Sequence, residues 1–253
     1  MKISLITAMF NSAETLRDTM QSVLNQTYKD VEYIIVDGGS KDATIDIVKE
    51  FEPRFEGRLR WVSERDRGIY DAMNKGIRMA TGDVIGILNS DDFFAADDIL
   101  EKVNAEFEAH DDIDGVYGDV IYVDNKDVTK IVRRYSSAKF DRRKIIYGMM
   151  PAHPSFYAKK SCFEKYGYYS LDYKIAADYD MFVRFVWGGN ISIKYIPVDF
   201  VVMRTGGMSS SGMTARKIIM REHMASVRAH GVPSNFFLQS LRYFGKIIDL
   251  IKK

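Results

Sequence analysis

Short apolar runs alternate with amphipathic stretches in the N-terminal part of the chain. The apolar runs stop abruptly at polar or glycine-rich residues, as strands buried on both faces do, and they lie at 3–8, 31–36, 59–63 and 84–88. Between them, apolar residues recur at helical spacing at 13–24, 43–51 and 69–80. Ser12 and Asp42 stand where the N-caps of the first two helices are expected. The alternation predicts βαβ units and parallel strands.

The C-terminal part follows a more mixed pattern. It predicts a hairpin between strands at 116–119 and 128–132, and further strand material at 191–203. Helices are expected at 97–107, 159–166 and 178–187, and again from residue 214 onward. We therefore expect an α/β fold with one mixed central sheet in residues 1–212, followed by a C-terminal helical extension at 213–253.

Composition narrows the class of protein. The chain has 253 residues, of which 46% are hydrophobic and 28% are charged, as in ordinary globular enzymes. Its net charge of +1 gives no attraction to nucleic acid, and a single cysteine, Cys162, excludes an internal disulfide or a cysteine zinc site. The start of the chain does not resemble a signal peptide, and no run approaches the ~20 apolar residues of a membrane span. A cytoplasmic location is expected.

Two adjacent carboxylates, Asp91 and Asp92, follow the apolar run at 84–88. In α/β sheets, ligands bind outside the carboxyl ends of the strands, and paired carboxylates suit Mg2+ or Mn2+ that bridges to a diphosphate. Alternatively, both acids cap and charge the first turn of a helix that begins near Ala95. Taken alone, the pair favours the helix cap.

Two earlier strands also end in an acid, at Asp37 and Asp66. Parallel strands open onto the same sheet edge, so these acids are expected beside Asp91 and Asp92, where Asp37 would hold ribose hydroxyls or a base edge. A turn followed by a capped helix is the structural alternative for the Asp37 loop. The convergence of three strand ends favours a nucleotide and metal site, although neither a dinucleotide-binding motif nor a P-loop motif is present.

An ordered series of motifs covers much of the chain. It consists of Thr7-x-x-x-Asn11, Gln26-Thr27-Tyr28, Glu32-x-Ile34-Ile35-Val36-Asp37-Gly38-Gly39-Ser40-x-Asp42-x-Thr44, Asp66-x-Gly68-Ile69-Tyr70-Asp71-Ala72-x-Asn74-Lys75-Gly76 and Leu88-Asn89-Ser90-Asp91-Asp92. Over residues 1–210 the chain resembles glycosyltransferase family 2, in particular the bacterial enzymes that build colanic-acid-type exopolysaccharides and O-antigens. The resemblance implies a GT-A fold, with a nucleotide-binding half at 1–92 and an acceptor half at 93–212.

The resemblance also implies roles for individual residues. Asp91 and Asp92 would bind Mn2+ or Mg2+, and Asp178 would be the catalytic base, although Ala177 stands where many members carry an acid and Asp180 is a rival. The residues expected to bind substrate are Thr7, Asn11, Asp37, Asp66, Lys75, Asp91, His153 and Arg204.

Three features of the second half of the chain need separate interpretation. His153 is a secondary candidate, because a lone histidine is commonly a hydrogen-bonded structural residue. Arg204 opens a polar loop at 204–209 that resembles the family's loop over the diphosphate or acceptor. Residues 214–253 interleave basic and aromatic side chains, so contact with the anionic inner face of the cytoplasmic membrane and packing against the domain or a second copy are both open.

The function implied by the resemblance is that of an inverting, metal-dependent glycosyltransferase. Its donor would be a UDP-hexose or UDP-N-acetylhexosamine, and its acceptor a glycan or polyprenyl-diphosphate-linked glycan in bacterial surface polysaccharide synthesis. A sugar nucleotidyltransferase is one alternative, but it would need a basic glycine-rich loop where the chain has Met9-Phe10-Asn11-Ser12. A non-catalytic, membrane-associated assembly partner is the other, and it would tolerate loss of the acids that this chain retains.

Overall fold

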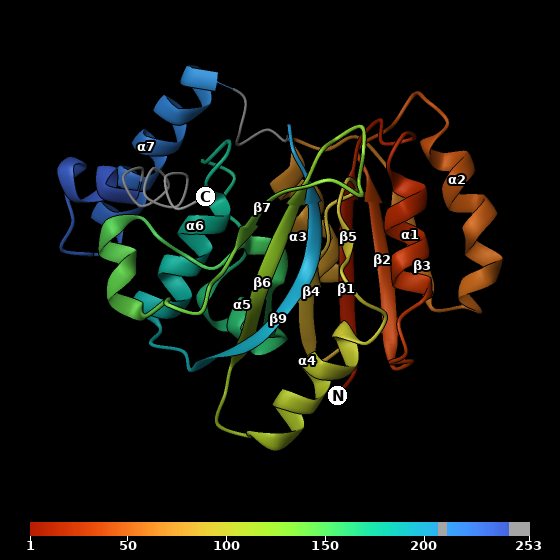
Figure 1. Cartoon of the computed structure of the whole chain (residues 1–253), viewed down its shortest axis with the longest axis horizontal. Helices are drawn as coiled ribbons and strands as arrows, with labels where there is room; N and C mark the ends of the chain where they lie inside the picture. The colour runs from red at the N-terminus through yellow and green to blue at the C-terminus, as the bar shows by residue number, and fades with distance from the viewer. Residues whose placement is uncertain (207–211, 243–253) are drawn as a thin grey trace.

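A mixed sheet of nine strands forms the middle layer of the described residues, with helices on both of its faces (Figure 1). This computed structural model describes residues 1–206 and 212–242. The strands follow the order β3-β2-β1-β4-β8-β6-β9-β5, and β7 pairs with β6. They are β1 (Ile3–Met9), β2 (Val31–Asp37), β3 (Leu59–Ser63), β4 (Val84–Ile87), β5 (Phe93–Phe94), β6 (Gly115–Val123), β7 (Ile131–Tyr135), β8 (Phe156–Lys159) and β9 (Ile193–Arg204).

Two hydrophobic cores lie on opposite faces of the sheet. Side chains alternate along β2, so that Ile34 packs with α3, α5 and α6 on one face while Tyr33 packs with α1, α2 and α4 on the other. The helices are α1 (Leu16–Leu24), α2 (Thr44–Phe51), α3 (Ile69–Met79), α4 (Ile99–Ala109), α5 (Lys160–Tyr166), α6 (Ala177–Phe182) and α7 (Gly212–Ala229), with the short turns η1 (Glu52–Phe55), η2 (Arg142–Tyr147), η3 (His153–Ser155) and η4 (Val183–Gly188). The chain is also helical over 236–242.

The first four strands are parallel, as the alternating pattern predicts. Met9 pairs with Asp37 at the ends of β1 and β2, and Asp37 pairs with Ser63 at the end of β3. On the other side of β1, Ile6 pairs with Ile87 of β4. The carboxyl ends of these strands therefore meet at one edge of the sheet, the upper edge in Figure 1.

The second half of the sheet supplies the antiparallel pairs. β8 runs antiparallel to both β4 and β6, whereas the long strand β9 runs parallel to β6 and pairs at its end with β5. The hairpin between β6 and β7 is also present. The mixed central sheet expected from the sequence is confirmed.

Several boundaries differ from those expected. The first helix begins at Leu16 because the preceding residues form a turn, so Ser12 is not its N-cap and its hydroxyl instead lies 2.9 Å from that of Ser90. Asp42 does accept the backbone N–H of Thr44 at the start of α2. The helix expected at 178–187 is the short helix α6 followed by the wider helical turn η4.

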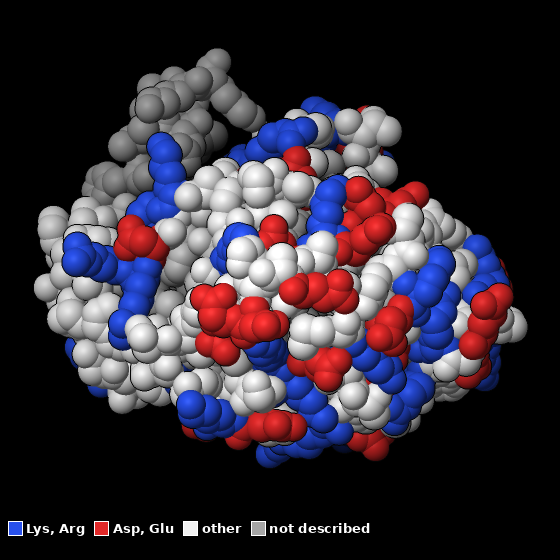
Figure 2. Space-filling view, turned by 90° about the horizontal axis from the view of Figure 1, so that it is seen from below, with Lys and Arg blue, Asp and Glu red and all other residues white. Residues whose placement is uncertain are grey.

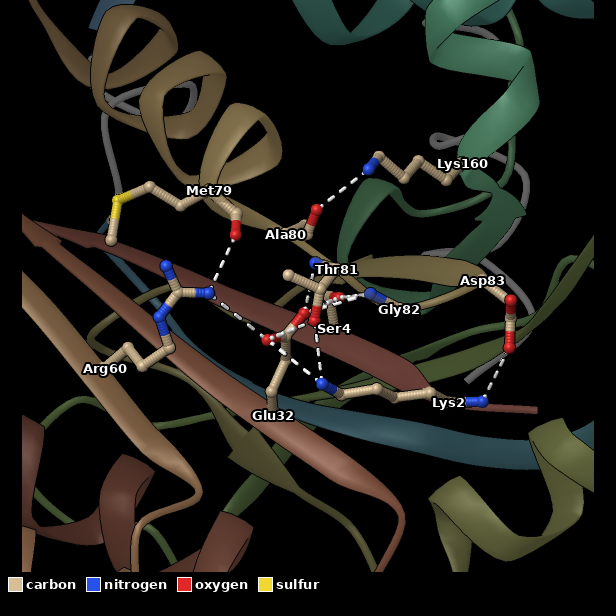
Figure 3. A network of polar contacts seen from close by, with 10 residues as sticks. All are labelled: Lys2, Ser4, Glu32, Arg60, Met79, Ala80, Thr81, Gly82, Asp83 and Lys160. Carbon is tan, nitrogen blue, oxygen red and sulfur yellow. Dashed lines mark hydrogen bonds and ion pairs between the residues drawn. The ribbon is translucent and has the colours of Figure 1, made fainter.

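A buried carboxylate closes the opposite, lower edge of the sheet (Figure 3). Glu32 is 5% exposed, and it accepts hydrogen bonds from the Ser4 hydroxyl at 2.5 Å and from the backbone N–H of Gly82 at 3.0 Å. Burial alone would raise the pKa of Glu32, but the hydrogen bonds from Ser4 and Thr81 and the charge of Lys2 outweigh burial and lower the pKa to about 2. Figure 2, which views the molecule from this side, shows acidic and basic side chains intermingled over much of the face.

The helices of the described ranges are short or, like α7, carry several charged side chains. None of those within 1–206 and 212–242 combines the length and the apolar character that crossing a bilayer requires. Of the C-terminal extension, α7 packs against the domain through buried side chains, which include Glu222, Ser226 and Val227. Residues 243–253 of the region expected to contact a membrane lie outside the described residues.

Candidate active site

The polar corner that follows β4 is held by α1. The hydroxyls of Thr15 and Thr19 donate to the backbone oxygen of Ser90 at 2.8 and 3.1 Å, and Thr19 also donates to the backbone oxygen of Asp92 at 2.7 Å. After the corner the chain forms β5, and the next helix, α4, begins only at residue 99. Asp91 and Asp92 therefore do not cap a helix, which removes the structural alternative for this pair.

Both acids of the corner have raised pKa values. Asp92 is 2% exposed, and burial together with the charge of Asp91 raises its pKa to about 8. The amide of Asn89 donates to Asp92 at 2.8 Å and offsets only part of this increase. Burial likewise raises the pKa of the half-buried Asp91. Arg204 also lowers both pKa values, but burial prevails for each acid. Two adjacent carboxylates whose pKa values stay raised match a cation site better than an internal salt bridge.

Arg204, the last residue of β9, fastens the corner from the other side. Its guanidinium donates to the backbone oxygen of Asp91 at 2.6 Å and to the carboxylate of Asp18, and it lies over the Phe93 ring at 5.2 Å from the centroid. The side chain is thus buried among protein groups. Contact of Arg204 with a diphosphate or acceptor remains a prediction, and residues 207–211 of its loop lie outside the described residues.

Asp37 and Thr7 are enclosed within the sheet edge. The carboxylate of Asp37 accepts the backbone N–H of Ser40 at 3.0 Å and the hydroxyl of Ser63 at 2.6 Å, so that it organises its own loop. The hydroxyl of Thr7 donates to the backbone oxygen of Leu88 at 2.7 Å and ties β1 to the exit of β4. Both Asp37 and Thr7 are 0% exposed, and their contact with a nucleoside remains a prediction.

Asp66 is brought against the loop after β2. A Cβ atom built on Gly38 would lie 2.5 Å from Oδ2 of Asp66 and 3.4 Å from the Phe10 ring, so a larger residue here would push the Asp66 carboxylate away. The Phe10 ring is 59% exposed. An exposed aromatic ring beside an acid and bare backbone is suited to stack on a nucleobase. Phe10 is not among the residues expected from the sequence to bind substrate. Its only signal there is its position, an aromatic residue directly after the first strand.

Asn11 and Lys75 connect the loops around this position. Asn11 adopts a positive φ of 50°, and its amide oxygen accepts the backbone N–H of Lys41 at 2.9 Å. Lys75, on α3, forms a salt bridge with Glu64 at 2.8 Å. Asn11 therefore joins the loops after β1 and β2, and Lys75 joins α3 to the loop after β3. Their contact with the donor remains a prediction.

A second cluster surrounds Asp178 in the first turn of α6. The Tyr70 hydroxyl lies 3.5 Å from Oδ1 of Asp178, and Nε2 of His153 lies 2.7 Å from the Tyr169 hydroxyl. Burial raises the pKa of Asp178, and the nearby His153 offsets part of that shift. Burial lowers the pKa of His153, which favours its neutral form. A carboxylate with a raised pKa beside a neutral imidazole is suited to accept a proton from a substrate.

Asp180 has a different environment from Asp178. It is 3% exposed, forms a salt bridge with Arg184 at 3.0 Å and contacts Ser226 and His230, both at 2.9 Å. Burial would raise its pKa, but these partners lower it. Because the carboxylate is occupied by protein groups, the geometry favours Asp178 over Asp180 as the base.

The two clusters are connected through β4 and the turn η3. In the antiparallel pairing of β4 with β8, Gly86 lies opposite Tyr157, so the chain enters β8 beside the carboxyl end of β4. The turn η3, which carries His153, contacts β4, β6 and β9. His153 therefore lies on a turn packed against the strand that leads to Asp91 and Asp92.

The residues at this edge could supply part of a cation site. Within the described ranges, no three side chains of His, Cys, Asp or Glu gather into a complete ligand set. Asp91 and Asp92 nevertheless offer hard oxygen donors, and Mg2+ in enzymes is commonly held by one or two carboxylates together with phosphate oxygens and water. The pair fits a divalent cation that binds together with a diphosphate.

Comparison with known proteins identifies the family. The chain matches the model described as Glycosyl transferase family 2 over residues 4–167. It is also 31% identical over 223 residues to a PGL/p-HBAD biosynthesis glycosyltransferase of Mycobacterium bovis, a match that covers 88% of this chain and 84% of the relative. The chain therefore belongs to glycosyl transferase family 2, which confirms the resemblance found in its motifs.

Solved structures confirm the GT-A fold. Residues 1–349 of S. aureus TarS in complex with UDP-GlcNAc match with a TM-score of 0.71 and 19% identity, over 90% of this chain and 66% of that one. The chain spans 40% of a longer TarS chain. The mannosyltransferase PcManGT from Pyrobaculum calidifontis, in complex with GDP-Man and Mn2+, matches with a TM-score of 0.66 and 16% identity, over 98% of this chain and 80% of that one.

Proposed function

We propose that this family member is a metal-dependent, inverting glycosyltransferase that moves a sugar from a nucleotide-diphosphate donor to a hydroxyl group of a glycan or a polyprenyl-diphosphate-linked glycan. The observation that carries the proposal is that the acidic pair Asp91–Asp92 follows β4, while His153, which interacts with Asp178, lies on the turn η3 that contacts β4. The first cluster suits the diphosphate of a donor, and the second suits the hydroxyl of an acceptor.

On the donor side, Phe10 would stack on the base, and Asp66 would accept a hydrogen bond from the base or ribose. Asp91 and Asp92 would hold Mn2+ or Mg2+, which when bound neutralises the charge that grows on the leaving diphosphate. Arg204 would keep the backbone of this corner fixed while the sugar bond breaks. The donor half thus combines an aromatic platform with a rigid acidic corner.

On the acceptor side, Asp178 would take the proton of the attacking hydroxyl. Its raised pKa makes it a stronger base than an exposed carboxylate, and His153, hydrogen-bonded to Tyr169, lines the same cluster. The acceptor oxygen would attack the anomeric carbon from the face opposite the diphosphate, so a single displacement inverts that centre. The transition state is oxocarbenium-like, so alignment matters more than basicity.

The relatives support a nucleotide sugar as the class of donor. The TarS structure contains UDP-GlcNAc, and the PcManGT structure contains GDP-Man with Mn2+. We favour a UDP-hexose or UDP-N-acetylhexosamine. The M. bovis relative is named for a biosynthetic glycosyltransferase, which supports a role in glycoconjugate synthesis, here that of a bacterial surface polysaccharide.

The C-terminal region would bring the enzyme to the anionic inner face of the cytoplasmic membrane, where a polyprenyl-linked acceptor lies. Met213, Phe236 and Phe237 are 74%, 65% and 69% exposed. Arg216 and Arg228 are also exposed. Exposed apolar side chains among cations suit the headgroup region of anionic lipids.

A donor screen tests the proposal. The purified protein is incubated with UDP-, GDP- and dTDP-sugars, with Mn2+ or with EDTA, and release of the nucleoside diphosphate is followed. We expect metal-dependent turnover of one donor, reduced at least ~10-fold in Asp178→Asn, with binding of the nucleoside diphosphate retained in calorimetry. Asp172→Asn, an exposed acid in the loop before α6, is the matched control and should behave as wild type.

The same screen separates the remaining alternative. A protein that neither binds nor turns over any nucleotide sugar, with or without metal, would overturn the transferase proposal and favour a non-catalytic assembly partner. Turnover that is equally fast in EDTA would overturn the metal's role. Full activity of Asp178→Asn would remove Asp178 as the base.

A further inference from the structure

The backbone directly before α6 is held by a carboxylate from the C-terminal extension. Glu222, in α7, is 4% exposed. Its Oε1 accepts the backbone N–H of Lys174 at 2.9 Å, and its Oε2 accepts those of Ile175 and Ala176 at 3.0 and 2.9 Å. Three consecutive backbone donors that lead into α6 are thus satisfied by one buried side chain.

The same face of α7 also holds the residues that follow Asp178. The imidazole of His223 stacks on the Tyr179 ring with 3.6 Å between centroids and an interplanar angle of 4°. Ser226 and His230, which follow Glu222 at intervals of four residues, both contact the carboxylate of Asp180 at 2.9 Å. Asp178 is therefore flanked on both sides by residues that α7 and its end fix in place.

The opposite side of this segment is fixed by α3. The hydroxyl of Tyr70 donates to the backbone oxygen of Ile175 at 2.5 Å and lies 3.5 Å from Oδ1 of Asp178. The Tyr70 ring stacks on Tyr169 at 5.7 Å between centroids. The loop before α6 is therefore clamped between α3, which belongs to the N-terminal half, and α7.

We propose that Glu222 is a positioning residue for the base, and that α7 is a working part of the acceptor site. This inference rests on the proposed function. By ordering residues 174–176, the Glu222 carboxylate fixes the direction in which α6 presents Asp178. Effective proton transfer needs the base within hydrogen-bond reach of the acceptor hydroxyl, and a displacement of ~1 Å lowers rates by about 100-fold.

The test compares Glu222→Gln and the milder Glu222→Asp with Arg221→Gln, an exposed neighbour on the same helix. The glutamine side chain would turn an N–H group toward one of the three backbone donors, and the aspartate side chain would be too short to reach all three. We expect kcat to fall ~10- to 100-fold in Glu222→Gln and less in Glu222→Asp, while the calorimetric Kd of the nucleoside diphosphate stays within ~2-fold of wild type. Arg221→Gln should match wild type in both.

Hydrogen exchange supplies a readout that does not depend on turnover. Amides of 174–180 should exchange faster in both Glu222 variants, with the exchange of β1, β2 and α3 unchanged. Unchanged kcat, or equal losses in kcat and nucleotide affinity, would overturn the positioning role. If the wild type turns over no donor, the proposed function fails, and the clamp is judged by exchange alone: faster exchange confined to 174–180 supports it, and unchanged exchange overturns it.

Discussion

Two buried acids at opposite edges of the same sheet have opposite electrostatics. Glu32 at the lower edge and Asp92 at the upper edge are 5% and 2% exposed, yet burial is outweighed in the first, whose pKa is lowered to about 2, and prevails in the second, whose pKa is raised to about 8. Glu32 is surrounded by donors and cations, whereas Asp92 has another carboxylate as its neighbour. The two carboxylates are buried to a similar extent, so the difference between their pKa values comes from the groups around them. The lower edge stabilises the fold, whereas the upper edge is suited to a ligand.

The largest expected effect is at the upper edge. Asp91→Asn should lower turnover of the donor at least ~1,000-fold, about 4 kcal/mol in activation free energy, because the metal and diphosphate lose a ligand. Its melting temperature should stay within ~3 °C of wild type, since the burial of this carboxylate opposes its charge. Asp97→Asn, an exposed acid six residues further along, is the control for both measurements. A parallel loss of activity in Asp97→Asn would contradict a specific role.

The reverse result is expected at the lower edge. Glu32→Gln should lower the free energy of unfolding at pH 7 by ~3 kcal/mol, because an amide cannot accept all the donors that surround Glu32. Turnover per folded molecule should not change. Urea unfolding and the donor assay on the same sample check both points, with Glu50→Gln at the surface as the neutral control. Reduced turnover in fully folded Glu32→Gln would break the division between the two edges.

The pH dependence of stability should carry the signature of Glu32. Its pKa is about 2 in the folded state against 4.5 unfolded, so its stabilisation is complete above pH ~4.5 and is lost as the pH falls toward 2. Between pH 6 and pH 3 this group should account for a loss of ~2 kcal/mol. Urea titrations of wild type and Glu32→Gln at both pH values measure the difference. Equal slopes in the two proteins would show that Glu32 is not the group responsible.

A smaller effect is expected for the exposed ring at the upper edge. Phe10→Ala should weaken UDP binding by ~5- to 20-fold, through loss of stacking worth ~1–2 kcal/mol, without changing the melting temperature. Ile131→Ala removes another exposed apolar side chain, far along the sequence in β7, and should leave UDP binding unaltered. Calorimetry with UDP and Mn2+ gives both values. Equal affinities of Phe10→Ala and wild type would remove the base platform.

The smallest effect has the opposite sign. Asp92→Asn should raise the free energy of unfolding by ~1 kcal/mol without metal, because the amide is neutral without having to bind the proton that burial and the charge of Asp91 force on Asp92 in the folded state. The same change from acid to amide would thus stabilise the upper edge and destabilise the lower one. Denaturation in EDTA measures it. A loss of stability equal to that of Glu32→Gln would show that Asp92 serves the fold.

Much of the parallel half follows from local patterns. Parallel pairing predicts that the acids after β2, β3 and β4 lie at the same edge of the sheet. The strands are parallel in the structure, and their carboxyl ends meet at one edge. The two-residue strand β5 could not be predicted, because Phe93 and Phe94 become a strand only by pairing with Val202 and Val201. Because β5 lies between Asp92 and the next helix, Asp91 and Asp92 are not at a helix start and do not act as helix caps.

The hydrogen-bond and salt-bridge partners of the candidate site residues could not be predicted from the sequence either. Asp178 and Asp180 differ only in their partners, and those of Asp180 lie on η4 and at the end of α7. Glu222 looks like any acid on a surface helix until the three backbone donors it binds, 46 to 48 residues earlier, are known. Such roles depend on contacts between distant segments, which no local periodicity encodes.

The contact between Arg204 and Asp18 joins residues 186 positions apart and, through Arg204, holds the backbone of Asp91. A nascent chain grows from its N-terminus at ~5–20 residues per second, so β1 to β4 can assemble many seconds before Arg204 leaves the ribosome. Closing so long a loop costs conformational entropy, so we expect the contact between Arg204 and Asp18 to form late in folding. The sheet edge that would hold the donor therefore exists first as an unfastened corner, and it becomes a complete site only when β9 has been made.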